Sequence, residues 1–446
     1  MQISAVHSVA PPNNNDCADR RDHGPDWNRR TALPVMLDPL LARLSRAPQL
    51  AALRHRGFRL LWFDTLFATT GRWADVVVIG WLTLELTNSA TWVGVVAASK
   101  MAGYFVAPFM GVLADRMDRR RLLLGAAMVN CTVAITMLFL YVSGHILLWH
   151  VIVLAMVSSL TWSLDSPTRQ SFVPDLVDGK DLTNAIAINA VASEMTVVAG
   201  PALGGLLIPA FGMGGAYAMM AFIYVMDLLL LSRLPAGRTP VKKQQESPLA
   251  SLLQGFRYVW GNQTVFMLLL IALLLNLFAA PYRYTFLPVF ARYVLETGPA
   301  GFGLLSSMAG VGAVVAGLWL VSQGNFRHRG ALLLAACFLW PGWLILFALS
   351  TSYTLSLGLI FLAGLFQAFC WTLIASLILS HTEAAMRGRV MGLRTGVVLA
   401  LPVGNFFAGG IADALGPPLA LIAYAVGSIL VMLVLVAKVP SLWRLE

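Results

Sequence analysis

The sequence predicts an all-α integral membrane protein whose twelve transmembrane helices form two pseudo-symmetric six-helix bundles. Three observations lead to this fold class: a very apolar composition, a series of apolar runs long enough to cross a bilayer, and basic residues confined to every second loop. The longest internal polar stretch follows the sixth run, so the runs divide into two sets of six.

The composition separates this chain from ordinary soluble domains. Of its 446 residues, 58% are hydrophobic and only 12% are charged, whereas a soluble domain carries about 25% charged residues. Apolar runs of roughly 18 or more residues predict membrane spans. We place these spans at 60–86, 91–113, 121–142, 147–165, 183–210, 214–233, 264–291, 300–321, 330–350, 353–380, 391–412 and 417–437.

The distribution of Lys and Arg predicts how the chain crosses the membrane. The net charge of +10 alone would be compatible with binding to nucleic acid, but the basic residues follow the alternation of the loops. Cytoplasmic loops carry an excess of Lys and Arg. Placing both termini in the cytoplasm puts nearly all of them on that side, with Arg292 as the exception. We therefore expect no nucleic-acid partner and a multi-pass protein embedded in lipid.

Five regions are expected along the chain. They are a partly disordered N-terminal tail with an amphipathic segment (1–58), a six-helix bundle (59–234), a cytoplasmic linker (235–262), a second six-helix bundle (263–438) and a short C-terminal tail (439–446). A weak repeat, Trp162-Ser163-Leu164 against Trp371-Thr372-Leu373, supports the division. Parallel halves of this kind are typical of transporters that alternate access by rocking one half against the other.

Several other classes of site have no sequence support. The four cysteines show no spacing for a metal site or a disulfide framework, so we expect no metal and no cofactor. The chain has no H-E-x-x-H, G-x-S-x-G or phosphate-cradling P-loop, so an enzyme is not expected. The N-terminus lacks the apolar core of a cleavable signal, so the first span acts as its own insertion signal.

A dense block of charge, G-V-L-A-D-R-M-D-R-R-R at residues 111–121, separates the second and third spans. It resembles the signature loop of the major facilitator superfamily, with matches at Gly111, Leu113, Asp115, Arg116, Arg119 and Arg120. Asp118 stands where that family usually has Gly. The resemblance implies a gating loop in which an Asp–Arg pair stabilises one conformation. The alternative is a charge cluster that only sets topology.

A second motif lies in the fifth span, at Gly200-Pro201-Ala202-Leu203-Gly204-Gly205. It resembles the end of the antiporter motif of proton-coupled drug exporters. Pro201 removes a backbone donor and is expected to kink the helix, while the glycines allow close packing. The alternative is an ordinary packing face of small residues.

The segment from Ser166 to Leu176, taken as a loop after the fourth span, resembles the branch of this superfamily that contains siderophore exporters and macrolide-type drug exporters. The resemblance extends from about Phe58 to Val439. It implies a monomer in the bacterial cytoplasmic (inner) membrane that exchanges a small-molecule substrate for protons.

Charged residues inside the spans are the sharpest candidates for transport chemistry, because each costs about 2.5 to 3.5 kcal/mol at the bilayer centre unless it is paired or hydrated. Arg72, Asp75, Lys100 and Glu194 lie at such depths in the first half. We expect them to form a neutral cluster, with Asp75 and Glu194 as proton carriers. The alternative is a static salt bridge. Asp64, Asp227 and Arg394 are instead expected to snorkel to the interface.

The substrate cavity is expected to draw on both halves. Candidates are Arg283 in the seventh span, which could meet an anionic substrate, together with Trp162, Trp371 and Gln367. Aromatic belts at the interface explain such residues equally well. The fourth span lacks an Arg in its middle, where many proton antiporters carry one.

These patterns favour a proton-driven exporter of a small amphipathic molecule, either a drug or a siderophore. A solute:proton symporter or a lysophospholipid flippase on the same scaffold remains an alternative, and a non-transporting membrane sensor is a third class. The sequence does not identify the substrate.

Overall fold

The computed structural model describes residues 48–106, 117–235, 248–324 and 328–438. Within these ranges the chain is almost entirely helical and contains no β-strand. In lipid every backbone polar group must be satisfied internally, and a helix achieves this within one segment. The predicted all-α membrane class is confirmed.

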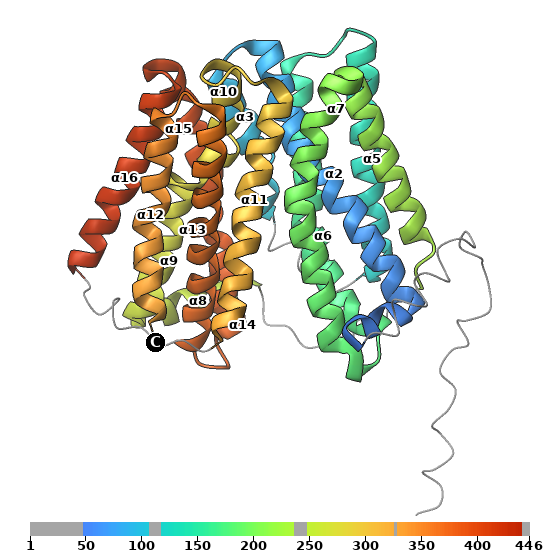
Figure 1. Cartoon of the computed structure of the whole chain (residues 1–446). Coiled ribbons are helices and arrows are strands. Elements are labelled where there is room, and N and C mark those ends of the chain that lie inside the picture. The colour runs from blue at the N-terminus through green and yellow to red at the C-terminus, as the bar shows by residue number, and fades with distance from the viewer. Residues whose placement is uncertain (1–47, 107–116, 236–247, 325–327, 439–446) are drawn as a thin grey trace, which may run out of the picture.

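The first half of the structure consists of long helices joined by short turns. Its elements are η1 (Pro48–Arg54), α2 (Arg56–Thr87), α3 (Ala90–Ser99), α5 (Arg119–Val142), α6 (Leu148–Leu176), η2 (Gly179–Asp181) and α7 (Leu182–Ser232). Within α7 the backbone leaves helical dihedrals at Gly212, where φ is 71° and ψ is 175°. A residue without Cβ adopts this conformation at little cost. The chain reverses there, so α7 contains two antiparallel segments (Figure 1).

The second half begins with α8 (Pro248–Gly261), inside the predicted linker. The elements that follow are α9 (Gln263–Phe278), η3 (Ala280–Arg283), α10 (Phe286–Tyr293), α11 (Gly298–Gln323), α12 (Arg329–Leu349), α13 (Tyr353–Ser380), α14 (Arg387–Val397), α15 (Ala400–Leu415) and α16 (Pro417–Lys438). Leu253, Phe256 and Trp260 of α8 expose their apolar side chains, as an amphipathic helix at a membrane surface does.

Three predicted spans are interrupted in the structure. The span at 91–113 stops at Ser99 and turns at residues 100–102, the span at 264–291 is divided by η3, and the span at 391–412 breaks between α14 and α15. Pro281 explains the second interruption, because it lacks the amide hydrogen that would continue α9. Broken helices in transporters mark places where backbone and polar side chains line a cavity.

Nine helical segments in the described residues are long and apolar enough to cross a membrane. One of them, Gly179–Ser232, has 54 residues. At 1.5 Å per residue it would far exceed the roughly 30 Å of a bilayer core, so it accounts for two crossings. The chain is therefore a multi-pass membrane protein, and the total of twelve spans stays a prediction.

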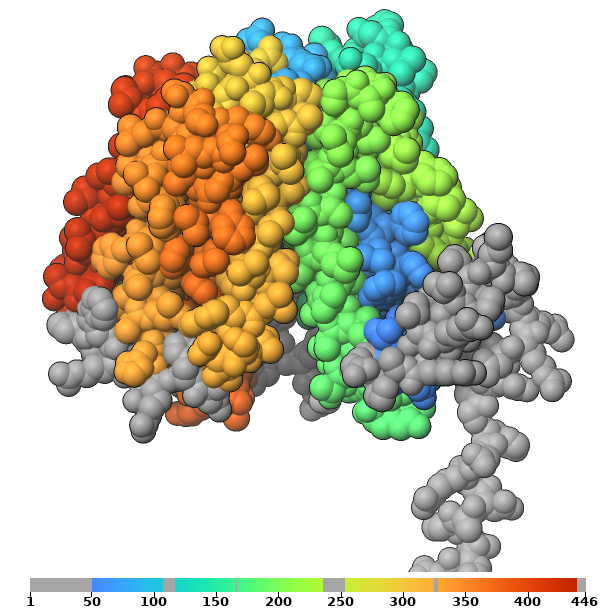
Figure 2. All heavy atoms as spheres, viewed as in Figure 1, coloured from blue at the N-terminus to red at the C-terminus, as the bar shows by residue number. Residues whose placement is uncertain are grey.

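The two halves touch at one end of the molecule and separate toward the other (Figures 1 and 2). We call the end that carries η1, η2 and α8 the basic end, and the other the opposite end. The halves meet where α3 packs on α15 and α7 packs on α11. At the second contact a Cβ added to Gly205 would lie only 2.7 Å from the Cα of Gly303. Small residues therefore allow the two backbones to approach closely.

Candidate transport site

A cavity lies between the two halves, close to the interruption that follows α3. It is lined mostly by apolar side chains of α2 and α3, with Val398 and Leu401 contributed from the second half. Its polar lining consists of Lys100, Tyr104, Trp162 and Tyr284, and no carboxylate lines it. An apolar pocket with a few polar groups is the usual form of a small-molecule site. The predicted cavity residue Trp162 is thus placed on this cavity.

Lys100 occupies the C-terminal end of α3, where the helix stops. The turn is held because the amide of Gly103 donates to Ser159 Oγ at 2.8 Å. The Lys100 ammonium forms an ion pair with Asp75 of α2, and both side chains are largely buried. The C-terminal end of a helix also favours a cation. Two of the four predicted coupling residues are therefore direct partners.

Asp75 connects the first cavity to a second, smaller one inside the first half. This inner cavity is lined by α2, α5, α6 and α7 and includes Asp75, Asn130 and the Tyr217 side chain. The Tyr217 hydroxyl is buried and has no hydrogen-bond partner among the described residues. The Asp75–Lys100 pair thus separates a polar space in the first half from the space between the halves.

Arg72 does not pair with Asp75, although the two lie three residues apart on α2. Its Nη2 instead donates to Asp165 of α6 at 2.5 Å. Its guanidinium also lies 5.2 Å from the centre of the Trp162 ring, within reach of a cation–π interaction. The expected neutral cluster of four residues is therefore wrong. Arg72 pairs with Asp165, whereas Lys100 pairs with Asp75.

A second group of buried charges lies in the first half, and the sequence analysis did not recognise that its members meet. We call it the buried charge cluster; its members are Asp64, Arg72, Asp165, Arg169 and Asp227. Arg169 is its centre, with Nε at 2.9 and 3.0 Å from the two Asp165 oxygens. Arg169 Nη1 pairs with Asp64, and Nη2 lies 3.6 Å from Asp227 Oδ1.

The buried charge cluster corrects three expectations. The segment 166–176 is not a loop, because α6 continues to Leu176 and carries Arg169, whose side chain is 5% exposed, into the interior. The fourth span therefore extends further than expected and carries a buried Arg near its basic end, while its middle contains none. Asp64 and Asp227 do not snorkel, since they are 0% and 2% exposed. Sequence hydropathy placed these residues near span ends, and it could not reveal that three helices converge on them.

Glu194 and Arg283 face each other across the halves without forming an ion pair. Glu194 on α7 is exposed, and Arg283 of η3 is its charged neighbour. The Arg283 guanidinium lies 4.8 Å from the centre of the Trp73 ring of α2. Its Nη2 is buried and has no hydrogen-bond partner among the described residues. A buried cationic donor without an acceptor is costly, and an anionic ligand would supply that acceptor.

The other two predicted cavity residues lie within the second half. Gln367 Oε1 accepts from the Tyr282 hydroxyl at 3.1 Å. The Trp371 ring packs edge-on against Trp340 at 6.1 Å between centroids. Neither belongs to the lining of the cavity that holds Trp162. The structure therefore does not bring Trp162 and Trp371 together, although the repeat relates them.

The charged loop at residues 111–121 is only partly described. Gly111, Asp115 and Arg116 lie outside the described residues. Arg119 forms an ion pair with Asp175 at the basic end of α6. Arg120 donates to the carbonyl oxygens of Leu231 and Ser232. Asp118 accepts from the Arg121 amide at 3.0 Å, so the departure from the family glycine supplies an N-cap for α5.

The glycines of the antiporter-like motif pack against two different helices. Added Cβ atoms at Gly200 and Gly204 would lie 2.4 Å from Trp73 Cβ and 2.6 Å from the Ala74 carbonyl oxygen, both on α2. Gly205 faces α11 instead, and Gly303 of that helix also approaches the Pro201 carbonyl oxygen. The motif therefore serves as a small-residue contact both within the first half and between the halves. The dihedral break in α7 lies at Gly212.

Asp413 closes the contact at the opposite end. Its carboxylate on α15 accepts from the amides of Ala90 and Thr91 at 2.8 and 2.9 Å, and from Ser89 Oγ at 2.6 Å. A carboxylate at this position caps the N-terminus of α3 and complements its dipole. Arg292 adds a second contact to Asn88 at 2.6 Å. Both contacts join the two halves.

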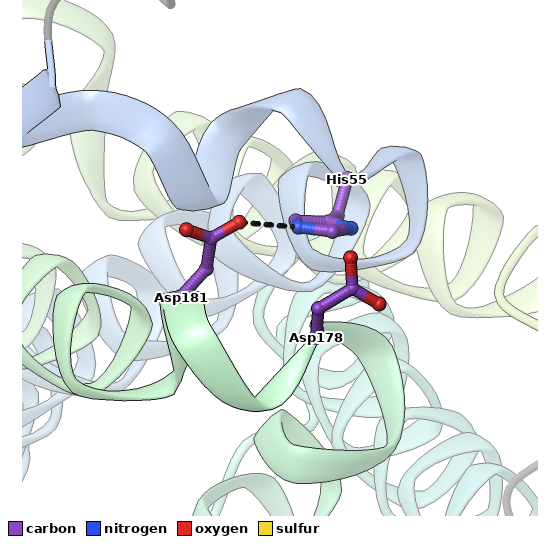
Figure 3. Close-up of side chains that lie close together, drawn as sticks. All are labelled: His55, Asp178 and Asp181. Carbon is purple, nitrogen blue, oxygen red and sulfur yellow. Dashed lines mark hydrogen bonds and ion pairs between the residues drawn. The ribbon is translucent and has the colours of Figure 1, made fainter.

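His55, Asp178 and Asp181 gather at the basic end, where η1 meets η2 (Figure 3). His55 Nε2 lies 2.9 Å from Asp181 Oδ2, and Asn184 accepts from the Ala52 amide nearby. The ligand atoms of the three residues lie within 4.8 Å of one another. We interpret the group as a polar contact that holds η1 against the turn between α6 and α7.

Comparisons with known proteins agree with this geometry. The chain is 28% identical to the enterobactin exporter EntS of Escherichia coli, over 81% of this chain and 86% of that protein. It is 22% identical to the staphyloferrin A transporter of Staphylococcus aureus, over 78% of this chain and 87% of that protein.

Solved structures share the fold at low identity. The nucleoside transporter NupG superposes with a TM-score of 0.70 at 12% identity, over 85% of this chain and 99% of that chain. A bacterial homologue of the lysosomal transporter Spinster, in an inward-facing and unoccupied conformation, superposes with a TM-score of 0.62 at 15% identity, over 88% of this chain and 96% of that chain.

The family assignment rests on a match across nearly the whole chain. Residues 47–444 match the model of the transmembrane secretion effectors. The relatives and solved structures named above are transporters and not enzymes. The chain therefore belongs to the transmembrane secretion effector family of major facilitator superfamily transporters.

Proposed function

We propose that this protein exports a small anionic amphipathic molecule of the siderophore class across the bacterial inner membrane, in exchange for protons. The observation that carries this proposal is the cavity between the halves, whose charged lining residue is Lys100 and whose other polar lining groups are aromatic. Such a site suits acidic oxygens attached to an amphipathic body. The names of the relatives, an enterobactin exporter and a staphyloferrin A transporter, point to the same class.

Arg283 provides a second cationic group for an anionic substrate. Its unpartnered Nη2 and its position over Trp73 place it at the boundary between the halves. A substrate anion bound there would contact both halves at once. Binding energy could then differ between conformations, as alternating access requires.

The described contacts support one conformation of the transport cycle. The halves are joined at the opposite end by Asp413 and by the packing of α7 on α11. If the basic end faces the cytoplasm, as the distribution of Lys and Arg predicts, this state is open inward. An exporter in this state is ready to accept substrate from the cell.

Proton coupling is assigned to the ion pair at the cavity. Asp75 and Lys100 separate the inner cavity from the substrate cavity. For exchange, the pair must separate and Asp75 must accept a proton at a stage of the cycle in which no substrate is bound. Glu194 is the second proton-carrier candidate, because it is exposed beside Arg283.

Transport in inverted membrane vesicles tests this proposal. With an acid interior, we expect wild-type vesicles to accumulate an iron-free siderophore, and collapse of the proton gradient should stop the accumulation. A lipophilic phosphonium cation, which carries the opposite charge to the proposed substrate, serves as the comparison substrate. Accumulation of the cation instead, or siderophore flux that survives collapse of the gradient, would contradict the proposal. Uptake only in right-side-out vesicles would indicate a symporter.

A charge-neutral variant tests the substrate contact. Arg283→Gln should raise the apparent KM for the siderophore about tenfold, because a hydrogen bond to a charged group contributes about 1.5 to 3 kcal/mol. Arg387→Gln is the matched control, since Arg387 is exposed in the same half. Equal KM values for the two variants would remove Arg283 from the substrate site.

A further inference from the structure

We propose that the buried charge cluster binds one proton, shared by the carboxyl groups of Asp64 and Asp227. This inference rests on the proposed proton-driven export and adds a further protonation site to the candidates Asp75 and Glu194. The site lies away from the Asp75–Lys100 pair and does not line either cavity. Its members come from α2, α6 and the second segment of α7.

The first argument is the balance of charge. The cluster contains three carboxylates and two guanidinium groups, so with every group ionised it carries one excess negative charge. Asp64, Asp165, Arg169 and Asp227 are each at most 5% exposed. An uncompensated charge at such a position costs several kcal/mol. One bound proton makes the cluster neutral.

The second argument is the proximity of two acids. The carboxyl groups of Asp64 and Asp227 approach the two terminal nitrogens of the same Arg169 guanidinium. Ionised carboxylates only accept hydrogen bonds, so two of them can share a hydrogen bond only when one holds a proton. Asp64 Oδ1 and Asp227 Oδ1 also have no hydrogen-bond donor among the described residues. A proton supplies the missing donor.

Asp165 is not the group that holds this proton. Both of its oxygens accept from Arg169 Nε, and one also accepts from Arg72 Nη2. Two guanidinium groups therefore stabilise its ionised form. Asp227 interacts more weakly with Arg169, because its Oδ1 lies 3.6 Å from Arg169 Nη2. Asp165 is a positioning residue that fixes both arginines, whereas Asp227 is the acid with the least compensation.

The other titratable groups around the pair do not change this balance. Cys131 of α5 and Tyr224 of α7 face Asp227. A buried thiol and a phenol are both neutral at ordinary pH. The ionised groups that act on the acid pair are therefore the other members of the cluster, Arg169, Arg72 and Asp165.

Arg72 connects this site to the substrate cavity. It bridges Asp165 of the cluster and the face of Trp162, which lines the cavity. Substrate that binds against Trp162 would therefore change the environment of Asp165 and, through Arg169, that of the acid pair. Substrate and proton occupancy are linked reciprocally in such an arrangement, and exchange requires that each disfavours the other.

Infrared spectroscopy of the purified full-length protein in lipid nanodiscs tests the site directly, because a protonated carboxyl has its own carbonyl stretch. We expect a protonated-carboxyl band in the wild type at neutral pH, and its loss in both Asp227→Asn and Asp64→Asn. Asp175→Asn is the matched control, since this largely buried acid pairs with a single arginine of the same half. Its band should be unchanged. A wild type without the band, or a band that survives both cluster variants, would overturn the inference.

Transport separates this inference from the proposed function. Asp227→Asn should abolish accumulation driven by the proton gradient while retaining substrate exchange across vesicles without a gradient. Thermal unfolding curves show whether each variant is folded. Asp64→Asn provides a second variant of the same site in case Asp227→Asn does not fold. Proton-driven transport that is unaltered in both variants would contradict the inference while leaving the exporter intact. Failure of siderophore transport in the wild type, with the infrared band present, would instead contradict the proposed substrate alone.

Discussion

The two halves share an architecture but differ in what they bury. Among the described residues, Asp64, Lys100, Asp165, Arg169 and Asp227 are buried charges of the first half, whereas Arg283 is the buried charge of the second. The interior of the second half is aromatic instead, with Tyr282, Trp340 and Phe347 fully buried. A well-packed apolar interior is often at least as stable as one that contains buried ion pairs. Folding stability alone therefore does not explain why the first half buries charges.

This difference indicates a division of labour. Buried charges cost stability and persist where they perform a function. Under the proposed function, the first half holds the candidate groups for proton exchange, and the second half supplies the apolar wall, Arg283 and the Asp413 contact that closes one end. Rocking of the halves changes the contacts between them but leaves contacts within each half in place.

The largest expected effect comes from removing the centre of the buried charge cluster. Arg169→Ala leaves three carboxylates with one guanidinium, and breaking a buried pair costs about 3 to 5 kcal/mol. Arg394→Ala is the control in the second half, where the guanidinium is only half-buried and donates to the Trp371 carbonyl at 3.4 Å. We expect a loss of about 1 kcal/mol there. Thermal unfolding of the purified variants measures both. Similar losses would mean that the halves do not differ as described.

The Asp75–Lys100 pair distinguishes a proton switch from a static salt bridge. Asp75→Asn and Lys100→Met should each reduce proton-driven export at least about tenfold, since each leaves a buried charge without its partner. The double variant removes both charges, so it should recover the stability that each single variant loses by leaving one charge unpaired. Export measured in vesicles should stay absent in the double variant if the pair carries the proton. Recovery of export would show that the pair is only structural.

Much of the fold could be predicted from the sequence, because hydropathy and the alternation of basic loops report directly on lipid contact. The ends of most spans agree with the helices, and the polar stretch at 235–262 falls between the halves. The interruptions after Ser99 and at η3 were not predicted, because both segments remain apolar across the break.

The candidate site was predictable only in part. Lys100 and Asp75 were recognised because they are charged residues inside predicted apolar spans. Asp165 and Arg169 were missed because they lie beside Pro167 in a stretch of low hydropathy that looks like a loop. The i,i+4 spacing of Asp165 and Arg169, together with acids near the same depth in two other spans, was the available signal. Only the packing of three helices shows that these charges meet.

Asp413 tests whether contacts between the halves set the conformational equilibrium. Asp413→Ala removes the N-cap of α3, which contributes about 1 kcal/mol, so the population open at the opposite end should rise about fivefold. Spin-label distances between the start of α3 and the end of α15 measure this shift. Ser89→Ala removes only one of the three hydrogen bonds and should have a smaller effect. An unchanged distance distribution in Asp413→Ala would show that helix packing alone closes this end.

The smallest effect is expected at the basic end, where Arg119 pairs with Asp175. Both residues belong to the first half, so rigid rocking leaves their contact unbroken, and the pair cannot by itself distinguish the two conformations. Their side chains are 21% and 11% exposed, and a partly exposed ion pair contributes about 1 kcal/mol or less. Arg119→Ala and Asp175→Asn should therefore lower stability slightly and leave the spin-label distances at both ends unchanged. A shift as large as that of Asp413→Ala would instead assign the pair to a latch between conformations.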